Sequence, residues 1–328
     1  MNAIVLDGIG LPLALREVPE PVPAAGEARV QIKAAALNHR DWWIQKGQYA
    51  GLKFPCILGS DGCGILVDNI PGISSGQEVI LNPALAWGSS NQVQAKSFHI
   101  LGLPTQGTFA EYIAIPTKNI AQKPKHLSSE QAAALPLAGL TAYRATISRG
   151  QAAKGKRILI NGIGGGVALF ALKFALAVGA EVWVTSGKQE KIDKALDMGA
   201  SGGTLYTQPN WGKKWAKEGI LFDLVVDGAG GNGFSQLIEV AAPGGIITTY
   251  GGTQGPVNEL FMQKIFYKQL SILGCTMGSP AEFAQMLDLV NEHKIIPVVS
   301  TALSMEEAEQ GIRLIDNATQ FGKIVLKW

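Results

Sequence analysis

The stretch from Arg157 to Ala180 (RILINGIGGGVALFALKFALAVGA) constrains the fold more than any other part of the chain. Its apolar, β-branched start at Ile158, Leu159 and Ile160 predicts a buried strand. The glycine cluster and the long apolar run behind it predict a tight turn and a buried helix. A second β-rich run, EVWVT, follows at 181–185. Strand, helix and strand in this order are the building block of a parallel, doubly wound α/β sheet.

The glycine turn predicts a dinucleotide site. Glycines let the backbone approach a pyrophosphate, whose charge is stabilised by unpaired amide N–H groups at the helix start. The six-residue GxGxxG pattern is not met, because its last position, counted from Gly162, is Val167. A tight turn without a ligand is the alternative, since glycine-rich turns are common in α/β proteins. The residues that we expect at the cofactor are Gly162, Gly164, Gly165, Gly166 and Val167.

Length and composition limit the remaining possibilities. A chain of 328 residues favours two domains. Charged residues make up 16% and hydrophobic ones 47%, with a net charge of +2, so neither disorder nor a polyanion-binding surface is indicated. The absence of a basic cluster also counts against nucleic-acid binding.

The cysteines and the N-terminus indicate a reducing compartment. Cys56, Cys63 and Cys275 show neither a paired zinc spacing nor an even disulfide framework. The first ten residues, MNAIVLDGIG, lack a basic segment followed by a long apolar core, so we expect a cytoplasmic protein. The apolar run behind the glycine turn contains Lys173 and is shorter than the ~20 residues that a bilayer needs, so we expect no membrane span.

An all-β region precedes the dinucleotide unit. Short β-like runs alternate there with glycine and proline, at Ala3–Leu6, Ala28–Ala35, Gly64–Val67, Glu78–Leu81 and Phe109–Ile115. Ser128 and Gln131 form a capping box, which predicts a helix that runs through Arg149.

Strands and helices continue to alternate after the dinucleotide unit. Strands are expected to end at Tyr206 and to span Phe222–Asp227, Gly245–Tyr250 and Leu270–Thr276, with helices at Lys188–Met198, near Gly233–Ala242 and near Val257–Tyr267. With the first two strands this makes six, enough for a complete Rossmann sheet. The tail predicts helices at Ala281–Glu292 and near Ser304–Ile315 and a closing strand at Gly322–Lys327.

This order of regions resembles the medium-chain dehydrogenase/reductase superfamily over nearly the whole chain. The motifs that support the resemblance are LNHRDWWIQKGQY at 37–49, LGSDGCG at 58–64, GTFAEYI at 107–113, LPLAGLTAY at 135–143 and FGKIVL at 321–326. The resemblance implies a GroES-like, mainly-β catalytic domain of residues 1–121 plus 278–328. A Rossmann dinucleotide-binding domain of residues 122–277 is inserted into it.

The same resemblance implies that the zinc ligands of this superfamily are absent. Where zinc-dependent alcohol dehydrogenases have two cysteines and a histidine, this chain has Asn38, Leu137 and Ser60, and the structural-zinc lobe at 87–104 has no cysteine. Zinc needs about four N, S or O ligands, which no cluster here supplies. His39 is an alternative ligand, but a lone histidine is more often a hydrogen-bonded structural residue. We therefore expect no metal, and a zinc-dependent alcohol dehydrogenase is the less favoured alternative.

The pattern of Asn38, Asp41, Gly47 and Tyr49 resembles the NxxD...GxY signature of the zinc-free quinone oxidoreductase branch. Trp43 stands where that branch often has a tyrosine that lines the substrate cleft. Its large stacking face and single indole donor suit flat aromatic or hydrophobic carbonyl substrates. The resemblance implies hydride transfer to a quinone or an α,β-unsaturated carbonyl.

The residues after the second Rossmann strand favour NADPH. An NAD site usually has a carboxylate about 20 residues past the glycine turn, but here the strand ends in Ser186 and Gly187. By resemblance to quinone oxidoreductases, Ser186, Lys191 and Tyr206 would form a pocket for the 2′-phosphate, which cations and hydroxyl donors stabilise. The alternative is that the lysines at this helix start are only solvated.

Without a metal, hydrogen-bond donors must polarise the substrate carbonyl. Our candidates are the Asn38 amide and the Tyr49 phenol, with the cofactor ribose, while Trp43 lines the substrate. Asp61 is expected to be a structural carboxylate. Further cofactor contacts are expected at Thr141, by family position, and at Gly228, Ala229, Gly251 and Gly252, where two Rossmann strands end.

Two questions concern activity and assembly. A rival function is an NADPH-binding protein with little catalysis, with a sensing, structural or RNA-binding role. The strand at Leu270–Cys275 should be the last of the Rossmann sheet and thus an edge, which natural proteins cover or pair. In related enzymes this edge pairs across a twofold axis, which implies a homodimer.

Overall fold

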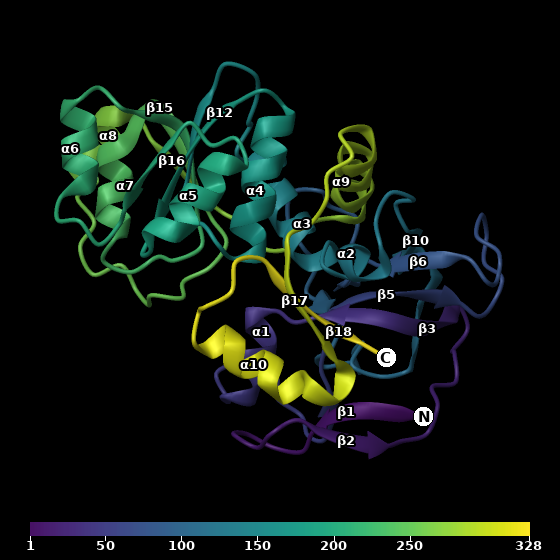
Figure 1. Cartoon of the computed structure of the whole chain (residues 1–328). Helices are drawn as coiled ribbons and strands as arrows, with labels where there is room; N and C mark the ends of the chain where they lie inside the picture. Colours follow the sequence, from purple (N-terminus) through teal and green to yellow (C-terminus); the bar gives the residue numbers. More distant parts are fainter. The chain divides into compact units, whose positions relative to one another are not determined.

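The computed structural model describes residues 1–328, which form two compact units (Figure 1). The GroES-like unit comprises Met1–Ala138 and Ser279–Trp328, and the Rossmann unit comprises Gly139–Gly278. None of the helices combines the length and the apolar composition that crossing a bilayer requires.

A seven-stranded sheet forms the centre of the GroES-like unit. Its order is β10-β6-β5-β3-β18-β17, and β9 also pairs with β3. These strands are β3 (Glu27–Ala36), β5 (Asp61–Leu66), β6 (Glu78–Leu81), β9 (Tyr112–Pro116), β10 (Ile120–Gln122), β17 (Val299–Ser304) and β18 (Lys323–Lys327). The predicted strands in this region are therefore present, whereas β10 and β17 were not predicted.

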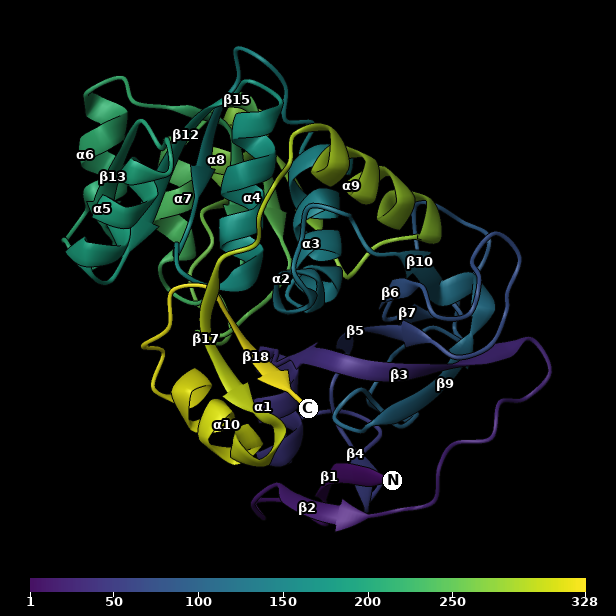
Figure 2. The ribbon, with the colours of Figure 1, turned by 45° about the vertical axis from the view of Figure 1, so that its right-hand side comes forward.

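The C-terminal tail belongs to this sheet. Strand β18 pairs antiparallel with β3, with Val325 opposite Ala36. The Lys323 side chain thereby reaches the carbonyl of Leu37, just past the end of β3. Figure 2 shows β17 and β18 side by side, with β18 at the end of β3. This pairing joins the two ends of the chain in one mainly-β unit.

Short elements complete the GroES-like unit. A three-stranded sheet contains β2 (Ala14–Glu17), β1 (Asn2–Leu6) and β4 (Cys56–Ile57), and β7 (Ala84–Leu85) pairs with β8 (His99–Ile100). Its helices are α1 (His39–Gln45), α2 (Ser129–Ala133), α9 (Pro280–Glu292) and α10 (Ala308–Asp316). Helix α1 was not predicted, because seven residues are too few for a clear apolar period.

The boundary between the units lies later than the sequence suggests. Residues 122–138 group with the GroES-like unit, because helix α2 packs on β3 and β5. The predicted capping box is present, since the Ser128 hydroxyl accepts a hydrogen bond from the Gln131 N–H. The helical run does reach Arg149 as its C-cap, because a π-helix, η2 (Arg144–Ser148), follows the last α-helical turn, but the run is interrupted after Ala133. Pro136 cannot extend helix α2 and instead begins a new helix, α3 (Pro136–Tyr143).

The Rossmann unit contains one parallel sheet of six strands, in the order β13-β12-β11-β14-β15-β16. They are β11 (Arg157–Ile160), β12 (Glu181–Ser186), β13 (Gly202–Leu205), β14 (Phe222–Asp227), β15 (Ala241–Thr249) and β16 (Ser271–Gly274). This is the doubly wound order that the sequence predicted. Successive strands are added on one side of β11 up to β13 and on its other side from β14 on, and such sheets bind ligands at this switch point, beyond the carboxyl ends of the strands.

Helices surround this sheet (Figures 1 and 2). They are α4 (Gly166–Ala177), α5 (Gln189–Asp197), α6 (Trp211–Lys217), α7 (Phe234–Val240) and α8 (Met262–Lys268), of which only α6 was not predicted. A buried aromatic group closes the core between sheet and helices: Trp215 of α6 packs against Trp183 of β12 and Phe222 of β14. These buried rings pack helix α6 against strands β12 and β14.

Candidate functional site

The glycine turn joins β11 to α4, as predicted. Gly162 has φ +77° and Gly164 has φ +132°, values that L side chains rarely adopt. A Cβ atom added at Gly162 or Gly165 would meet nothing within 4 Å, so the backbone at these two positions is open to a ligand. The first N–H groups of α4 have no partner within the helix, and the helix dipole favours an anion beside them. The turn therefore fits a pyrophosphate.

A buried polar network, which the sequence analysis missed, holds the turn in place. The Thr185 hydroxyl accepts from the Gly162 N–H at 3.0 Å and donates to Asn161 Oδ1 at 2.6 Å. The Asn161 amide in turn donates to Asp227 Oδ1 at 2.7 Å. Asp227 also accepts the N–H groups of Ala229 and Gly230. Polar residues at the carboxyl ends of otherwise apolar strands were the sequence signal for this network.

The three residues predicted for the 2′-phosphate lie together around the end of β12. Ser186 is buried, and its hydroxyl accepts from the Lys188 N–H at 3.2 Å. The Tyr206 hydroxyl lies only 2.6 Å from where a Cβ of Gly187 would be, and Lys191 Cδ lies 2.9 Å from the equivalent point at Gly164. Lys191 therefore lies beside the glycine turn. This grouping fits a phosphate on the adenosine ribose.

Several lysines lie close together around Lys191. Burial lowers the pKa of Lys191, and the neighbouring charges of Lys188 and Lys194 lower the pKa further, although Glu190 opposes them. A bound phosphate would relieve the repulsion between the lysines. The site is thus electrostatically suited to an anion.

The residues expected at the cofactor after β14 and β15, Gly228 with Ala229 and Gly251 with Gly252, have different surroundings. A side chain at Gly228 would collide with the Tyr250 ring, and one at Gly251 would lie 2.7 Å from the Gly228 carbonyl oxygen. Close approach of the two strand ends thus explains these glycines without a ligand. Gly252, by contrast, has open space beside it. Thr141 is buried, and its hydroxyl faces the Met277 sulfur at 3.9 Å.

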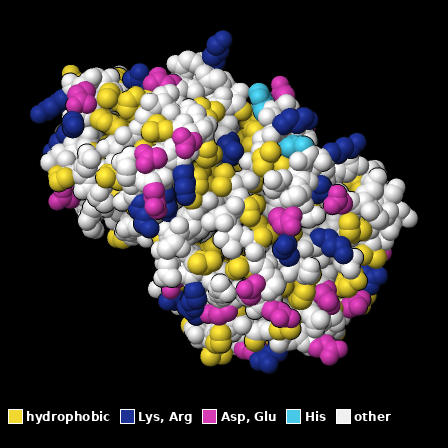
Figure 3. Space-filling view, viewed as in Figure 1, with side chains coloured by type: hydrophobic (Ala, Val, Ile, Leu, Met, Phe, Trp, Pro, Cys, Tyr) yellow, Lys and Arg dark blue, Asp and Glu magenta, His cyan; other side chains and the backbone are white.

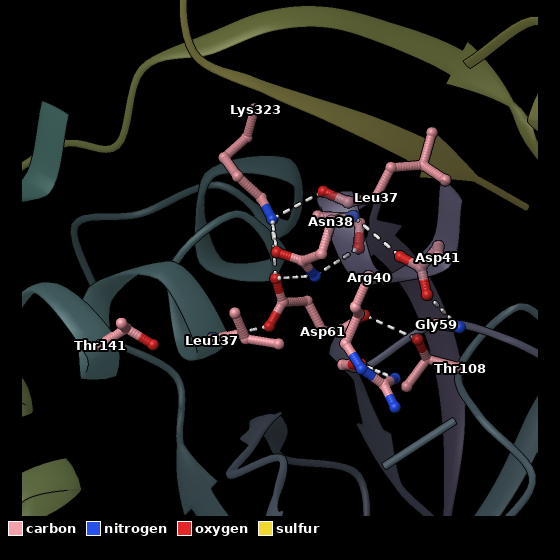
Figure 4. Close-up of polar contacts among 12 residues, drawn as sticks. Leu37, Asn38, Arg40, Asp41, Gly59, Asp61, Thr108, Leu137, Thr141 and Lys323 are labelled. Carbon is pink, nitrogen blue, oxygen red and sulfur yellow. Dashed lines mark hydrogen bonds and ion pairs between the residues drawn. The ribbon is translucent and has the colours of Figure 1, made fainter. Parts of the chain in front are cut away.

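The GroES-like unit contains a buried group of polar side chains that we call the cation cluster: Asn38, Arg40, Ser60, Asp61 and Lys323. The Lys323 ammonium donates to Asp61 Oδ2 at 2.9 Å and to Asn38 Oδ1 at 2.5 Å. The Asn38 amide nitrogen donates to the same Asp61 oxygen at 3.0 Å, and Leu137 N–H donates to the other at 2.7 Å. Figure 4 shows Lys323, Asn38 and Leu137 converging on Asp61.

Arg40 occupies the other end of the cation cluster. One amino group, Nη1, donates to Ser60 Oγ at 2.7 Å and to the Leu101 carbonyl at 2.9 Å. The guanidinium lies 5.1 Å from the centre of the Tyr49 ring, and its Nε faces the Tyr49 hydroxyl at 3.5 Å. Of the residues predicted to be catalytic, Asn38 and Tyr49 therefore contact the cluster or belong to it. Trp43 is half-buried and packs edge-on against Trp42.

The carboxylate of Asp41 orients the cluster from the first turn of α1. It accepts the Asn38 N–H at 2.8 Å and the Gly59 N–H at 3.4 Å. Burial raises the pKa of Asp41, although the nearby Arg40 charge and the two N–H groups oppose the rise. Asp41 therefore fixes the backbone of Asn38 at the point where strand β3 gives way to α1.

The positions expected for zinc ligands do not fit zinc. Asn38 offers an amide whose oxygen is bound to an ammonium group, Ser60 a hydroxyl bound to a guanidinium, and Leu137 no donor side chain. No group of three His, Cys, Asp or Glu residues is placed to hold a metal. In the segment 87–104, an edge-on pair of the Trp87 and Phe98 rings, 5.2 Å apart, packs the loop. The side-chain charges of Lys323 and Arg40 thus lie at the positions expected for catalytic zinc ligands, and aromatic packing lies in the segment expected for structural zinc.

Comparisons with known proteins agree with this architecture. A family model for the alcohol dehydrogenase GroES-like domain matches residues 24–125, and one for zinc-binding dehydrogenases matches residues 166–292. The zinc-type alcohol dehydrogenase-like protein YogA of Leptosphaeria maculans is 37% identical over 96% of this chain and 94% of its own length. The chain belongs to the medium-chain dehydrogenase/reductase superfamily.

Two further members of this superfamily bear on the chemistry. An acryloyl-coenzyme A reductase of Sulfurisphaera tokodaii is 30% identical over the full length of both chains. A crystal structure described as an NAD-dependent alcohol dehydrogenase superposes with a TM-score of 0.94, at 37% identity and with complete coverage of both chains. The zinc-binding dehydrogenase match at 166–292 includes none of Asn38, Ser60 and Leu137. The superfamily makes this chain an oxidoreductase with an NAD(P)-binding Rossmann unit.

Proposed function

We propose that this chain is a metal-independent, NADPH-dependent reductase of the quinone oxidoreductase-like branch. Its substrate would be a quinone or an α,β-unsaturated carbonyl compound. The observation that supports this most is the cation cluster, in which Lys323 and Arg40 contact Asn38 and Ser60, two of the positions expected for zinc ligands. An ammonium and a guanidinium repel a metal ion, and the amide and hydroxyl are poor ligands for it.

NADPH is the cofactor that the Rossmann unit fits best. The glycine turn and the start of α4 would hold the pyrophosphate, and Ser186, Lys191 and Tyr206 the 2′-phosphate. No carboxylate ends β12 to bind a ribose 2′-hydroxyl. When bound, the cofactor supplies a hydride. Because one similar structure is described as NAD-dependent, NADH is the alternative to test.

The GroES-like unit would orient and polarise the substrate carbonyl. The Tyr49 phenol is half-buried and has its O–H available to a substrate oxygen. The Asn38 amide nitrogen donates to Asp61, with a long 3.4 Å contact to the Ala36 carbonyl. We therefore propose that Tyr49 contacts substrate directly and that Asn38 contributes mainly through its position. Asp61, held by Lys323, remains structural and takes no part in proton transfer.

Trp43 supports a flat, conjugated substrate, since its half-buried indole is suited to stacking. Trp42 contacts it edge-on and itself packs against the core, with Lys46 over its ring. The acryloyl-coenzyme A reductase acts, by its name, on a conjugated thioester. Reduction of a conjugated carbon–carbon double bond is therefore the reaction that we test first, with quinones second. The proton that completes the reduction can come from solvent.

We further propose a homodimer in a reducing cytoplasm. Strand β16 lies at the edge of its sheet and pairs only with β15. On the adjoining helix α8, Phe266 is 67% and Tyr267 86% exposed, which is the kind of apolar surface that a second copy covers. All three cysteines are free. Sedimentation at micromolar concentration tests the dimer, and a monomeric mass would contradict it.

A binding protein with little catalysis is the second candidate. It is favoured by one observation, namely that the donors of Asn38 are engaged within the protein. RNA binding is the weaker form of this candidate, since Figure 3 shows acidic and basic side chains intermixed over the visible face. Such a protein would bind NADPH, seen as quenched tryptophan fluorescence, yet reduce nothing.

The deciding experiment follows oxidation of NADPH, and of NADH in parallel, with an enone and a quinone as acceptors. Each run is repeated after dialysis against a chelator. We expect turnover with NADPH that survives the chelator. Loss of activity on chelation, restored by added zinc, would refute the metal-free mechanism. NADPH binding without turnover of either acceptor would favour the binding protein.

A further inference from the structure

The two buried cations of the cation cluster differ in how many of their donors the protein uses. An ammonium has three N–H donors. Lys323 has three acceptors: the Leu37 carbonyl at 2.7 Å, Asn38 Oδ1 at 2.5 Å and Asp61 Oδ2 at 2.9 Å. Its charge is also balanced by the Asp61 carboxylate. Lys323 is therefore saturated and has nothing left to offer a ligand.

Arg40 is not saturated. A guanidinium has five N–H donors in a rigid fork. Two belong to Nη1 and are taken by Ser60 and the Leu101 carbonyl, while Nε faces the Tyr49 hydroxyl at the long distance of 3.5 Å. Nη2 is buried, and both of its hydrogens lack an acceptor in the chain. Buried donors without a partner are rare in folded proteins and ask for an explanation.

Arg40 also forms no salt bridge, although the Asp41 carboxylate beside it interacts with its charge. Arg40 is only 7% exposed. The neighbouring Asp41 carboxylate is directed instead at the N–H groups of Asn38 and Gly59. A guanidinium is permanently charged, so it cannot avoid this cost by losing its proton. A buried cation with a free, preoriented amino group is a site for an oxygen that is negative or becomes so.

We propose that Arg40 Nη2 binds the carbonyl oxygen of the conjugated substrate and stabilises the negative charge that forms on it. This inference rests on the proposed reductase function. The reductant is a reduced nicotinamide, whose C–H bond breaks with its electron pair as a new C–H bond forms at the β-carbon. The electron pair of the carbon–carbon double bond moves towards the carbonyl, so that an enolate oxygen carries the charge. A proton from water then adds to the α-carbon, and Arg40 keeps its own protons throughout.

The surroundings of Arg40 suit this task. Ser60 and the Leu101 carbonyl hold one edge of the guanidinium, and Tyr49 lies against it, so the donor is fixed before substrate arrives. Preorganised donors of this kind stabilise a transition state without reorganising. The two cations then have different roles. Lys323 neutralises Asp61, and Arg40 stabilises the substrate oxygen.

The test compares wild type with Arg40→Lys and Arg40→Gln. Arg16→Gln is the matched control, because Arg16 lies in the same unit but is exposed, paired with Asp7. Three quantities are measured: kcat for an enone with NADPH, the affinity for trans-cinnamate without cofactor by tryptophan fluorescence, and the melting temperature. Cinnamate presents a carboxylate in place of the enolate oxygen.

We expect both Arg40 variants to lower kcat by about 10²- to 10³-fold, the effect of removing one oxyanion donor. Arg40→Gln should weaken cinnamate binding by about tenfold or more, as loss of a hydrogen bond to a charged group does. Arg16→Gln should change neither. If Arg40→Gln unfolds, Arg40→Lys and partial rescue of Arg40→Ala by free guanidinium ion give the same answer.

The outcomes separate this inference from the proposed function. Turnover by Arg40→Lys within about threefold of wild type, with unchanged cinnamate affinity in Arg40→Gln, would overturn the role of Arg40 and leave the reductase in place. Arg40-dependent cinnamate binding by a wild type that reduces no acceptor would support the anion site and refute the reductase. A wild type that reduces the enone but binds no cinnamate, with full activity in Arg40→Lys, would refute the role of Arg40 alone.

Discussion

The glycine turn of the Rossmann unit and the cation cluster of the GroES-like unit present hydrogen-bond donors in two different ways. The turn uses backbone N–H groups at the start of α4, and the neutral side chains of Thr185 and Asn161 hold it. The cluster uses full charges, with Lys323 and Asp61 in contact at 2.9 Å and almost completely buried. The comparison shows that the backbone donors come from one local segment, although Thr185 and Asp227 from neighbouring strands hold it, whereas the charged side chains come from segments at opposite ends of the chain.

The largest expected effect is on stability, from breaking the buried ion pair. Lys323→Met leaves the Asp61 carboxylate uncompensated in the core, which should cost about 3 to 5 kcal/mol of unfolding free energy. Lys327→Met is the control, because Lys327 lies on the same strand, is exposed and sits 3.9 Å from Glu130. Urea unfolding followed by tryptophan fluorescence measures both. If both variants lost the same small amount of unfolding free energy, the buried ion pair would contribute no more than the exposed one.

A substitution in the glycine turn should weaken the binding of NADPH. Gly164→Ala puts a Cβ atom 2.9 Å from Lys191 Cδ, so the lysine side chain must move, and φ of +132° strains the backbone of the turn. We expect NADPH affinity to fall by about tenfold or more, because a displaced turn loses about one hydrogen bond to the charged pyrophosphate. Gly155→Ala is the control, since φ is +83° there and nothing lies near the added atom. A similar loss of affinity in both variants would argue against a local effect.

Lys191 tests whether side-chain charge also matters in the Rossmann unit. Lys191→Gln should raise the KM for NADPH about tenfold and leave that for NADH nearly unchanged, because only NADPH has the 2′-phosphate. The pKa of Lys191 is lowered by burial first and by Lys188 next. NADPH affinity should therefore decline as pH rises through this lowered pKa, whereas NADH affinity should not. Lys217→Gln, an exposed lysine on α6, is the control.

The smallest effect concerns two thiols in the tightly packed GroES-like unit. Burial raises the pKa of Cys56 to about 11 and that of Cys63 to about 12, so both remain thiols at pH 8. Iodoacetamide should modify them far more slowly in the folded than in the unfolded chain, because only the thiolate reacts. The folded-state rate should climb with pH up to about 11 for Cys56. Site-resolved mass spectrometry measures this, and rapid labelling at pH 8 would indicate a looser unit.

Sequence patterns predicted the Rossmann unit well, because its elements are long and periodic. Strand β14 has the predicted bounds, and the six-stranded order follows from alternating strands and helices. The same patterns missed α1 and α6, each of seven residues, and carried one helix past Pro136. Short elements give too little periodicity, and their positions depend on tertiary packing.

The candidate site divides in the same way. The glycines and the residues after β12 lie close in sequence to the strand ends that place them, so their grouping was predictable. Arg40 was not singled out within the motif at 37–49, because arginine side chains are mostly exposed to solvent. Its burial depends on Ser60 and Leu101, which come from separate segments.

The sequence by itself determined the superfamily, the doubly wound sheet and the glycine turn, because each depends on neighbouring residues or on ordered motifs. Only the tertiary structure decided which side chains contact Asn38 and Ser60. Strand β18 pairs with β3 and thereby brings Lys323 to Asp61, which lies 262 residues away along the chain. A contact of that separation has no local signature, because it forms only when both ends of the chain join one sheet.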